Sequence, residues 1–548
     1  MREHLYKLIR EGSRRAPLLL GLLLLLFSLA VVLGWSAANG LMDGRQNEIW
    51  HVGNALDLYG AFVDRDAWHL DYFMWTNYWP PGFYLFPWPL FAFLGATHEV
   101  MVLSNLGHLA ILLASVYLLG VEVRGRSVGL LAMALVTLYP GVMGNMVRYE
   151  PSVAVTAWVT LAALALARSR GFMMRGASVM FALAVAGGLM MDRLSLALFI
   201  ALPALYEFMR GLGQGAKRRR SVNVILGIVI VTALVGYWHW EFVHRHLEEI
   251  VSQGAGEIDA TGAYTELRDP TSLKSILFVF AVLLDGQAGL LPGLLGIAAI
   301  GWWLASRHSR ARVAGLVVLS SLLLFSLIQK KQVYYTVPIL GCLAVLTADL
   351  VSRLPAPRVV GAGLVALLAA QLGHRMSDNP PLGHGALQES LLGHGLTEGF
   401  GDGRYPQTSP PLGLDLPLDE VAAALPPGDV ITFSEDSLWF EGYVTLQMRE
   451  ALPESQVRGV IGDPWGSFEW YRAVGSFVIV QSSPEVRWPS QATLERGLTD
   501  HNYALEDLPP VAELIAGGGE DGRFELLGSW PWRDGVVSAW GNSSVLPR

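Results

Sequence analysis

Residues 17–36 read PLLLGLLLLLFSLAVVLGWS, a stretch of twenty residues that contains no charged side chain. Each residue of an α-helix adds about 1.5 Å, so a helix of this length crosses the ~30 Å hydrocarbon core of a bilayer. Similar apolar runs lie at 100–120, 221–240 and 333–351. Continuous apolar runs differ from the alternating pattern of membrane β-strands, and they predict a polytopic α-helical membrane protein.

The composition of the whole chain indicates the same class. Of its 548 residues, 52% are hydrophobic and 16% are charged, whereas soluble domains have about 25% charged residues. The single cysteine, Cys342, excludes a disulfide framework and a thiolate metal cluster. Segment 273–285 is too short to cross a bilayer and is expected to form a helix at the interface. About eleven spans are expected, at 17–36, 100–120, 127–145, 152–168, 176–191, 193–209, 221–241, 287–306, 312–328, 333–351 and 358–373.

The distribution of Lys and Arg predicts the orientation, because cytoplasmic loops carry an excess of both. With the N-terminus in the cytoplasm, the inner loops hold 20 of the 39 basic residues in about 56 positions, and the outer loops hold 9 in about 109. The two long outer loops are 37–99 and 242–286. The inner loops are 1–16, 121–127, 168–175, 209–220, 307–312 and 352–358.

The chain is expected to have three parts that differ in composition. Residues 1–373 form the transmembrane domain, 374–425 a linker rich in Gly, Pro and His, and 426–548 a small α/β domain outside the membrane. The last 174 residues carry 25 Asp and Glu against 10 Arg and no Lys, which argues against nucleic acid as a partner. Strands are expected at 429–434, 457–461 and 476–481, and a helix at 437–451.

Four basic residues end apolar runs on the predicted outer face: Arg148, Arg193, Lys330 and Lys331. Cations at one depth in the membrane are suited to bind a phosphate or pyrophosphate headgroup. The alternative is that each is a snorkelling span end, with Glu150 beside Arg148 and Asp192 beside Arg193 as local acid partners.

The first outer loop supplies two carboxylates, Asp43 and Glu48. At helical spacing Glu48, His51 and Ala55 share one face, and Asp43 and Asn47 share another. A partly desolvated carboxylate at a water–lipid boundary can act as a general base toward a sugar or lipid hydroxyl. The alternative is ordinary helix-start chemistry, because Asp and Glu favour a first helical turn.

The same loop is crowded with aromatic residues, 15 of them between Trp50 and Phe93. Its centre, Tyr78 to Pro89, reads YWPPGFYLFPWP, and the prolines fix a bent path rather than a span. Such a surface suits stacking against sugar rings or a polyisoprenoid chain. An interfacial aromatic belt is the alternative explanation.

Other chemistry has no support from motifs. The sequence contains no GxxxxGK[ST], no GxGxxG after a strand, no HExxH and no GxSxG. Charges near the middle of a span, which are typical of a proton-coupled transporter, are also missing.

Four short motifs follow one another on the predicted outer face. They are Asn47-Glu48 with Gly60 and the Tyr78–Tyr84 stretch, then Arg148-Tyr149-Glu150-Pro151, then Gly188–Arg193, and finally Lys331, Tyr335 and Pro338. In this order they resemble the GT-C glycosyltransferases, in the branch with protein O-mannosyltransferases, lipid A aminoarabinose transferases and lipopolysaccharide-core sugar transferases. The resemblance covers about 40–350. It departs at Asn47, which stands where the family has its first acid and cannot take a proton.

The resemblance implies a glycosyltransferase of the cell (inner) membrane, with its C-terminal domain in the periplasm. It implies inverting, metal-independent transfer of a sugar from a polyprenyl-phosphate donor to a lipid, glycan or protein hydroxyl, with membrane lipid around it and no cofactor. Glu48 or Asp43 would be the base, and Lys330, Lys331, Arg193 and Arg148 would bind the donor phosphate. A lipid-linked-glycan flippase or transporter, or an inactive GT-C scaffold, are the alternatives. The implied substrate-binding residues are His51, Tyr78, Trp79, Pro80, Pro81, Glu150 and Tyr335.

Overall fold

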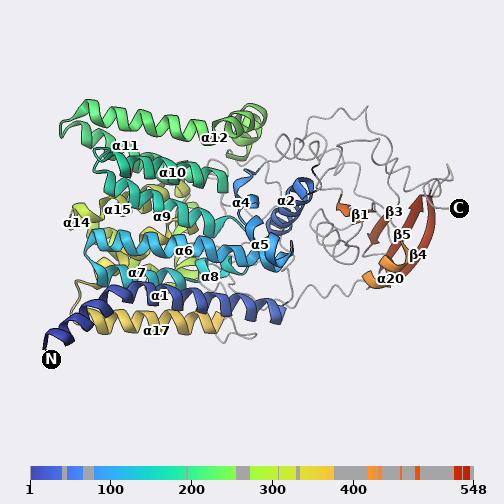
Figure 1. Ribbon diagram of the computed structural model, residues 1–548, viewed down its shortest axis with the longest axis horizontal. Helices are drawn as coiled ribbons and strands as arrows, with labels where there is room; N and C mark the ends of the chain where they lie inside the picture. The colour runs from blue at the N-terminus through green and yellow to red at the C-terminus, as the bar shows by residue number, and fades with distance from the viewer. Residues whose placement is uncertain are drawn as a thin grey trace. The chain divides into compact units, whose positions relative to one another are not determined.

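The computed structural model forms two compact units, each of which draws on two parts of the chain (Figure 1). The first unit consists of Met1–Leu41 and Phe73–Ser409, and the second of Met42–Tyr72 and Pro410–Arg548. The residues that the structure describes are 2–39, 46–63, 65, 79–192, 195–254, 272–306, 308–328, 334–375, 417–425, 430–434, 457–459, 476–481, 524–532 and 535–542.

The first unit is a bundle whose long helices lie side by side (Figure 1). Its helices are α1 (Arg2–Asn39), α4 (Gly82–Leu85), α5 (Trp88–Leu94), α6 (His98–Val123), α7 (Arg126–Leu138), α8 (Pro140–Met146), α9 (Ser152–Ser169), α10 (Arg175–Met191), α11 (Ser195–Leu212), α12 (Lys217–Gly254), α13 (Leu273–Val282), η2 (Leu283–Gln287), α14 (Leu290–Ser306), η3 (Ser309–Ala311), α15 (Arg312–Leu327), η4 (Val337–Ile339), α16 (Leu340–Val351) and α17 (Pro357–Arg375).

The predicted fold class, a polytopic α-helical membrane protein, is confirmed, and every predicted apolar run overlaps a helix. Within the described residues, five helices are long and apolar enough to cross a membrane, or six if the bent pair α7–α8 is one span. Shorter apolar helices lie at Gly82–Leu94, Arg175–Met191, Leu290–Ser306, Val337–Val351 and Pro357–Gly373. The count of about eleven spans stays a prediction.

Helix α9 lies in the core of the bundle, where it packs against α6, α10, α11 and α15. Its many alanines let neighbouring backbones approach closely. Thr156 and Thr160 are fully buried, and each donates its hydroxyl hydrogen to the carbonyl four residues earlier, at 2.7 Å. Both threonine hydroxyls of this central helix are therefore satisfied within the helix itself.

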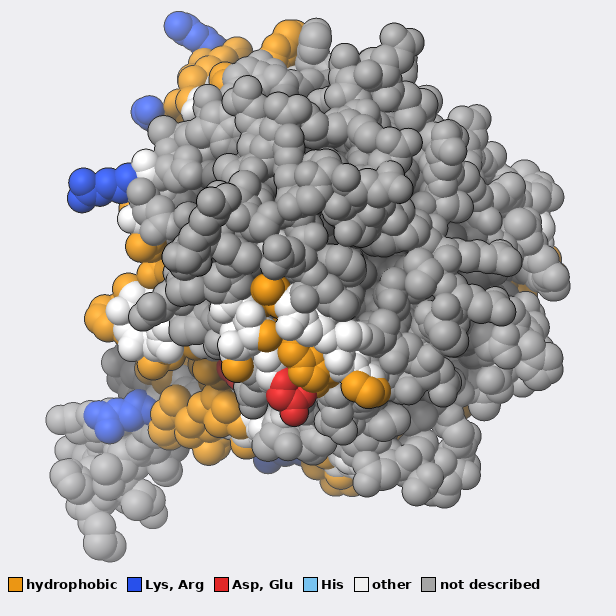
Figure 2. All heavy atoms as spheres, turned by 90° about the vertical axis from the view of Figure 1, so that its right-hand side faces the viewer, with side chains coloured by type: hydrophobic (Ala, Val, Ile, Leu, Met, Phe, Trp, Pro, Cys, Tyr) orange, Lys and Arg blue, Asp and Glu red, His pale blue; other side chains and the backbone are white. Residues whose placement is uncertain are grey.

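Helices α1 and α12 lie at the periphery and expose large apolar side chains such as Leu18 (76% exposed) and Trp240 (71%). Figure 2 shows exposed hydrophobic side chains (orange) close to projecting Lys and Arg side chains (blue) at its left edge. Apolar surface of this kind is costly in water, and it matches the hydrocarbon of a bilayer.

The apolar run 127–145, which the sequence predicts as one span, is bent by 59° between α7 and α8. The bend falls at Tyr139 and Pro140, where the proline ring prevents the helix from continuing unbroken. Tyr139 is extended (φ −62°, ψ 125°), as residues before proline tend to be. Segment 273–285 is helical as expected and continues into the π-helical turn η2. Its position at a lipid interface stays a prediction.

The second unit contains α2 (Gln46–Val63), α20 (Leu418–Ala424) and a five-stranded sheet in the order β2-β1-β3-β5-β4. Strand β1 (Val430–Ser434) pairs in parallel with β2 (Val457–Gly459) and β3 (Ser476–Gln481). Strands β4 (Phe524–Trp532) and β5 (Gly535–Asn542) form an antiparallel hairpin that extends the sheet from β3.

Strands β1, β2 and β3 occupy the three apolar stretches where strands are expected, whereas sequence reasoning missed the β4–β5 hairpin. Helix α20 lies inside the range assigned to the linker and packs against β4 and β5. The helix expected at 437–451 lies outside the described residues, and the proposed domain boundaries stay predictions.

Candidate active site

The turn between α8 and α9 carries Arg148 and Glu150, and it lies deep in the first unit. Arg148 is 1% exposed and Glu150 is 8% exposed. The last carbonyls of a helix lack partners within that helix. Just after α8, the side chain of Asn105 on α6 supplies such a partner. Asn105 Nδ2 donates to the Arg148 carbonyl at 2.5 Å. The same nitrogen lies 3.4 Å from the carbonyls of Asn145 and Met146. Asn105 therefore fixes the backbone that carries Arg148.

The Pro-Pro-Gly-aromatic segment packs directly on this turn. The Tyr149 hydroxyl donates to the carbonyl of Phe83 at 3.1 Å, and the two rings stack with centroids 4.5 Å apart. Complete burial raises the pKa of Tyr149 well above its usual value, so the phenol keeps the proton that it donates. The Tyr78–Tyr84 stretch of the first motif and the Arg148–Pro151 motif are thus joined by one hydrogen bond and one ring contact.

Gly82 brings the same segment against the end of α10. A Cβ at Gly82 would lie 2.6 Å from the carbonyl oxygen of Met190 and 2.7 Å from its Cβ, so any other residue would separate α4 from α10. On the far side of α10, His239 Nε2 of α12 lies 3.2 Å from the carbonyl of Leu189. The Gly188–Asp192 segment is therefore held between α4 and α12.

The turn that precedes α16 reaches the same end of the bundle through η2. Thr336 Oγ1 donates to Gln287 Oε1 at 2.8 Å, and both side chains are buried. The backbone of Gln287 packs against α8, where a Cβ at Gly141 would lie 2.9 Å from Gln287 Cα. Single π-helical turns such as η2 occur frequently at functional sites. Gln287 links the Tyr335 turn to the helix that leads into Arg148.

Sequence reasoning missed a polar face on α6. Asn105 and His108 are fully buried, and the imidazole of His108 stacks on Phe86 with ring centroids 3.8 Å apart. Among the described residues neither ring nitrogen of His108 has a hydrogen-bond partner. The available signal was the helical spacing of Ser104, Asn105 and His108 inside an otherwise apolar run.

In the second unit, α2 shows the face that helical spacing predicts. Glu48 and His51 are each 1% exposed and Ala55 is fully buried, so all three lie on the buried side of this helix. In the first unit, Trp79 and Tyr335 are half-buried, and Pro80 and Pro81 are buried. The remaining predicted residues, Asp43, Tyr78, Arg193, Lys330 and Lys331, lie outside the described residues. The functional role of every predicted residue stays a prediction.

No protein-family model and no curated protein sequence matches the chain. Solved structures do match it. ArnT from Cupriavidus metallidurans, bound to undecaprenyl phosphate, has a TM-score of 0.56 and 13% identity, with 94% of this chain and 97% of that chain covered. Its apo form has a TM-score of 0.55 at the same identity and coverage. The archaeal oligosaccharyltransferase AglB from Archaeoglobus fulgidus has a TM-score of 0.46 and 11% identity, with 98% and 75% covered.

The ArnT match shows the class of fold: the chain shares the polytopic helical fold of that structure, in agreement with the fold class that the sequence predicts. One structure that it resembles over nearly the full length of both chains is that of the aminoarabinose transferase ArnT.

Proposed function

We propose that this protein transfers a sugar from a polyprenyl-phosphate donor to a hydroxyl of a lipid, glycan or protein at the outer face of the cytoplasmic membrane, with inversion. The observation that carries the proposal is the packing of the motifs. Segment 79–84 touches both 148–151 and 188–192 at one end of the bundle, and the Tyr335 turn is linked to this end through Gln287. A fold like that of ArnT, solved with undecaprenyl phosphate, supports the choice of donor.

Arg148, Arg193, Lys330 and Lys331 bind the donor phosphate and stabilise the charge that it gains on leaving. The phosphate leaves with the electron pair of the bond to the anomeric carbon. A phosphate monoester is a stable anion at neutral pH, so no general acid is needed. The positive charges therefore act where negative charge develops.

Glu48 or Asp43 acts as the general base. It takes the proton of the acceptor hydroxyl while the acceptor oxygen attacks the anomeric carbon from the side opposite the phosphate. Because Asn47 stands at the position of the family's first acid, the base is displaced to one of these neighbours. We propose that this reaction proceeds without a divalent metal ion.

Aromatic and proline side chains contact the sugar and the prenyl chain. Tyr78, Trp79, Pro80 and Pro81 provide the apolar surface, and Tyr335 stands at the turn that follows Lys331. His51 and Glu150 provide polar contacts to sugar hydroxyls. This distribution of roles follows the resemblance to the family.

An inactive GT-C scaffold is the second candidate, and the departure at Asn47 is the observation that favours it. Purified full-length protein would be incubated in detergent with a panel of undecaprenyl-phosphate sugars, labelled in the sugar, and with membrane extract as acceptor. The proposal predicts labelled product together with free undecaprenyl phosphate in equal amounts. If the donor binds but stays intact with every sugar, the proposal is contradicted. A transporter or an inactive scaffold would then be the remaining functions.

A further inference from the structure

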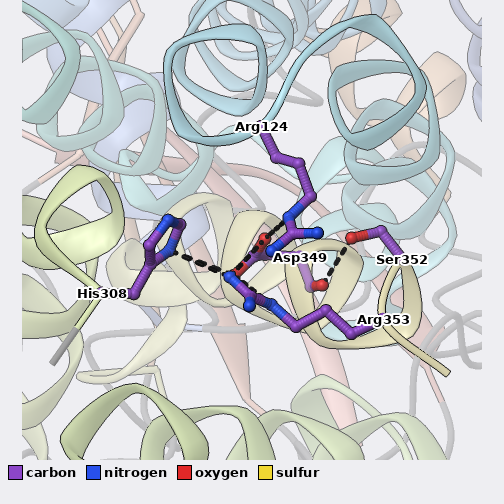
Figure 3. A network of polar contacts seen from close by, with 5 residues as sticks. All are labelled: Arg124, His308, Asp349, Ser352 and Arg353. Atoms are coloured by element: carbon purple, nitrogen blue, oxygen red, sulfur yellow. Dashed lines mark hydrogen bonds and ion pairs between the residues drawn. The ribbon is translucent and has the colours of Figure 1, made fainter. Parts of the chain in front are cut away.

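Three loops meet around one carboxylate at the end of the bundle opposite the Arg148 turn. Asp349, at the end of α16, is 4% exposed and is contacted by cations from two directions. Arg124 Nε lies 2.7 Å from Asp349 Oδ1, and Arg353 Nη2 lies 3.0 Å from Oδ2. Figure 3 shows Arg124, Arg353 and His308 arranged around Asp349, each from a different loop. The basic-residue count predicts that all three loops are cytoplasmic.

Positive charge exceeds negative charge in this cluster. His308 Nδ1 lies 3.2 Å from Arg353 Nη2, which donates to it when that nitrogen is unprotonated. Burial lowers the pKa of His308, and the charges of Arg353, Arg124 and Arg310 lower it further, against the opposing effect of Asp349. The imidazole is therefore mainly neutral at pH 7. Two guanidinium groups, those of Arg124 and Arg353, then face a single carboxylate.

The guanidinium of Arg124 keeps hydrogen-bonding capacity for a further anion. Only its Nε contacts Asp349, and 37% of the side chain is exposed. A guanidinium has five N–H donors, and its terminal pair matches two oxygens of a phosphate. The terminal N–H groups of Arg124 therefore lie on the exposed side of the cluster, where they can bind a further anion.

Apolar surface adjoins the cations. The guanidinium carbon of Arg353 lies 5.6 Å from the centroid of the Trp302 ring, and Trp302 is 44% exposed on the last turn of α14. Ala305 lies three residues further along that helix and is also exposed. Tryptophan is enriched at the level of lipid headgroups. A ligand that satisfies both parts of this surface has an anionic headgroup and apolar chains.

We propose that Arg124, Arg310 and Arg353, together with Trp302, bind the phosphate headgroup of an anionic glycerophospholipid from the cytoplasmic leaflet. Basic pockets between membrane helices on that side bind such headgroups in other proteins. The site is separate from the proposed sugar transfer and does not depend on it. A bound phosphate headgroup neutralises the positive charge that Asp349 alone does not balance.

The test uses full-length protein in neutral detergent with equimolar phosphatidylglycerol and phosphatidylcholine of identical chains, and native mass spectrometry counts the retained lipids. The wild type is expected to retain phosphatidylglycerol roughly tenfold more than phosphatidylcholine. Arg124→Gln and Arg310→Gln are each expected to reduce that preference about fivefold. Arg310→Gln is informative because it leaves every contact to Asp349 described above in place.

The matched control is Arg168→Gln at the same end of the bundle. Arg168 pairs with Glu122 at 2.9 Å and has 34% of its side chain exposed, so the charge change and exposure are comparable. This variant should retain the wild-type preference. Equal losses in all three variants, or no preference in the wild type, would overturn the proposal. Displacement of the lipid by an equal concentration of glycerol phosphate would show a free-phosphate site and would also overturn it.

Discussion

At the scale of single residues, Asn105 shows how a polar side chain in an apolar helix organises a site on another helix. Its amide donates to the carbonyl of Arg148, forty-three residues away in sequence. A buried carbonyl without a hydrogen-bond partner lowers the free energy of unfolding. Asn105 therefore stabilises the turn by supplying the donor that the Arg148 carbonyl needs.

Replacing Asn105 with leucine should lower stability. Asn105→Leu keeps the side-chain volume similar and removes the amide donor. The Arg148 carbonyl then lacks this hydrogen bond, which should lower the free energy of unfolding by about 1–3 kcal/mol. Thermal unfolding in detergent measures the loss. Ser104→Ala is the control, because the Ser104 hydroxyl bonds only within its own helix, and its effect should stay within about 0.5 kcal/mol. An unfolding temperature for Asn105→Leu equal to that of the wild type would contradict the assigned role.

The base is the second question at this scale. Asp43→Asn and Glu48→Gln each keep shape and hydrogen bonding while they remove the basic lone pair. The true base should lose about 10²–10⁴-fold in turnover with little change in donor affinity. We expect Glu48 to be the base, because it occupies a family acid position and shares the buried face of α2 with His51.

Asn47→Asp is the complementary variant, because it restores the acid that the family has at this position. Higher sugar transfer in this variant would show that the wild-type protein carries out the proposed reaction with a displaced base. If all three variants transferred sugar at the wild-type rate, neither carboxylate would be the base.

At the scale of secondary-structure elements, the short helix α4 depends on close approach to α10. The absence of a side chain at Gly82 lets the two backbones meet at Met190. The turn at 148–151 then packs on α4 through Tyr149. The placement of three motifs therefore depends on one glycine.

Gly82→Ala should separate these elements. The added methyl group overlaps the backbone of Met190, and overpacking of this kind costs about 1–3 kcal/mol. The expected result is a lower unfolding temperature together with weaker stabilisation by undecaprenyl phosphate. Gly34→Ala on α1 is the control, because a Cβ there meets nothing within 4 Å and alanine favours a helix by up to about 1 kcal/mol. Equal behaviour of the two variants would show that the contact at Gly82 is unimportant.

The elements also show what the sequence can and cannot predict. Apolar runs predicted the helices, because length and hydrophobicity alone decide whether a segment spans a bilayer. The bend at Pro140 was missed because the apolar run continues through it. The β4–β5 hairpin was missed because Gly528 and Pro531 interrupt its apolar pattern. The roles of Asn105 and Gln287 depend on partners distant in sequence, which no local period reveals.

At the scale of the whole molecule, charge divides the first unit into two ends. One end carries the Arg148 turn and the motif segments, and the other carries the arginines around Asp349 and around the buried Glu207, which pairs with Arg210 at 3.2 Å and also with Arg312. Positive residues concentrate on the cytoplasmic side of membrane proteins. The orientation that this rule predicts puts the proposed sugar transfer at the outer face of the membrane.

Labelling of single cysteines tests this orientation. Ala260→Cys and Glu450→Cys should react with an impermeant thiol reagent added from outside, and Arg218→Cys should react only after the membrane is opened. Native Cys342 is fully buried and should stay silent. Reaction at 218 in intact cells, with silence at 260 and 450, would reverse the topology.

The central claim is that lipid phosphate binds at the end that carries the motifs, and affinity for undecaprenyl phosphate tests it most directly. Lys330→Gln with Lys331→Gln removes two charges, and each charge-assisted hydrogen bond is worth roughly 1.5–3 kcal/mol, so binding should weaken at least tenfold. Arg218→Gln with Arg219→Gln makes the same charge change in the first turn of α12 and should bind like the wild type. Wild-type protein that gains no thermal stability from undecaprenyl phosphate, or unchanged affinity in the lysine variant, would contradict the account.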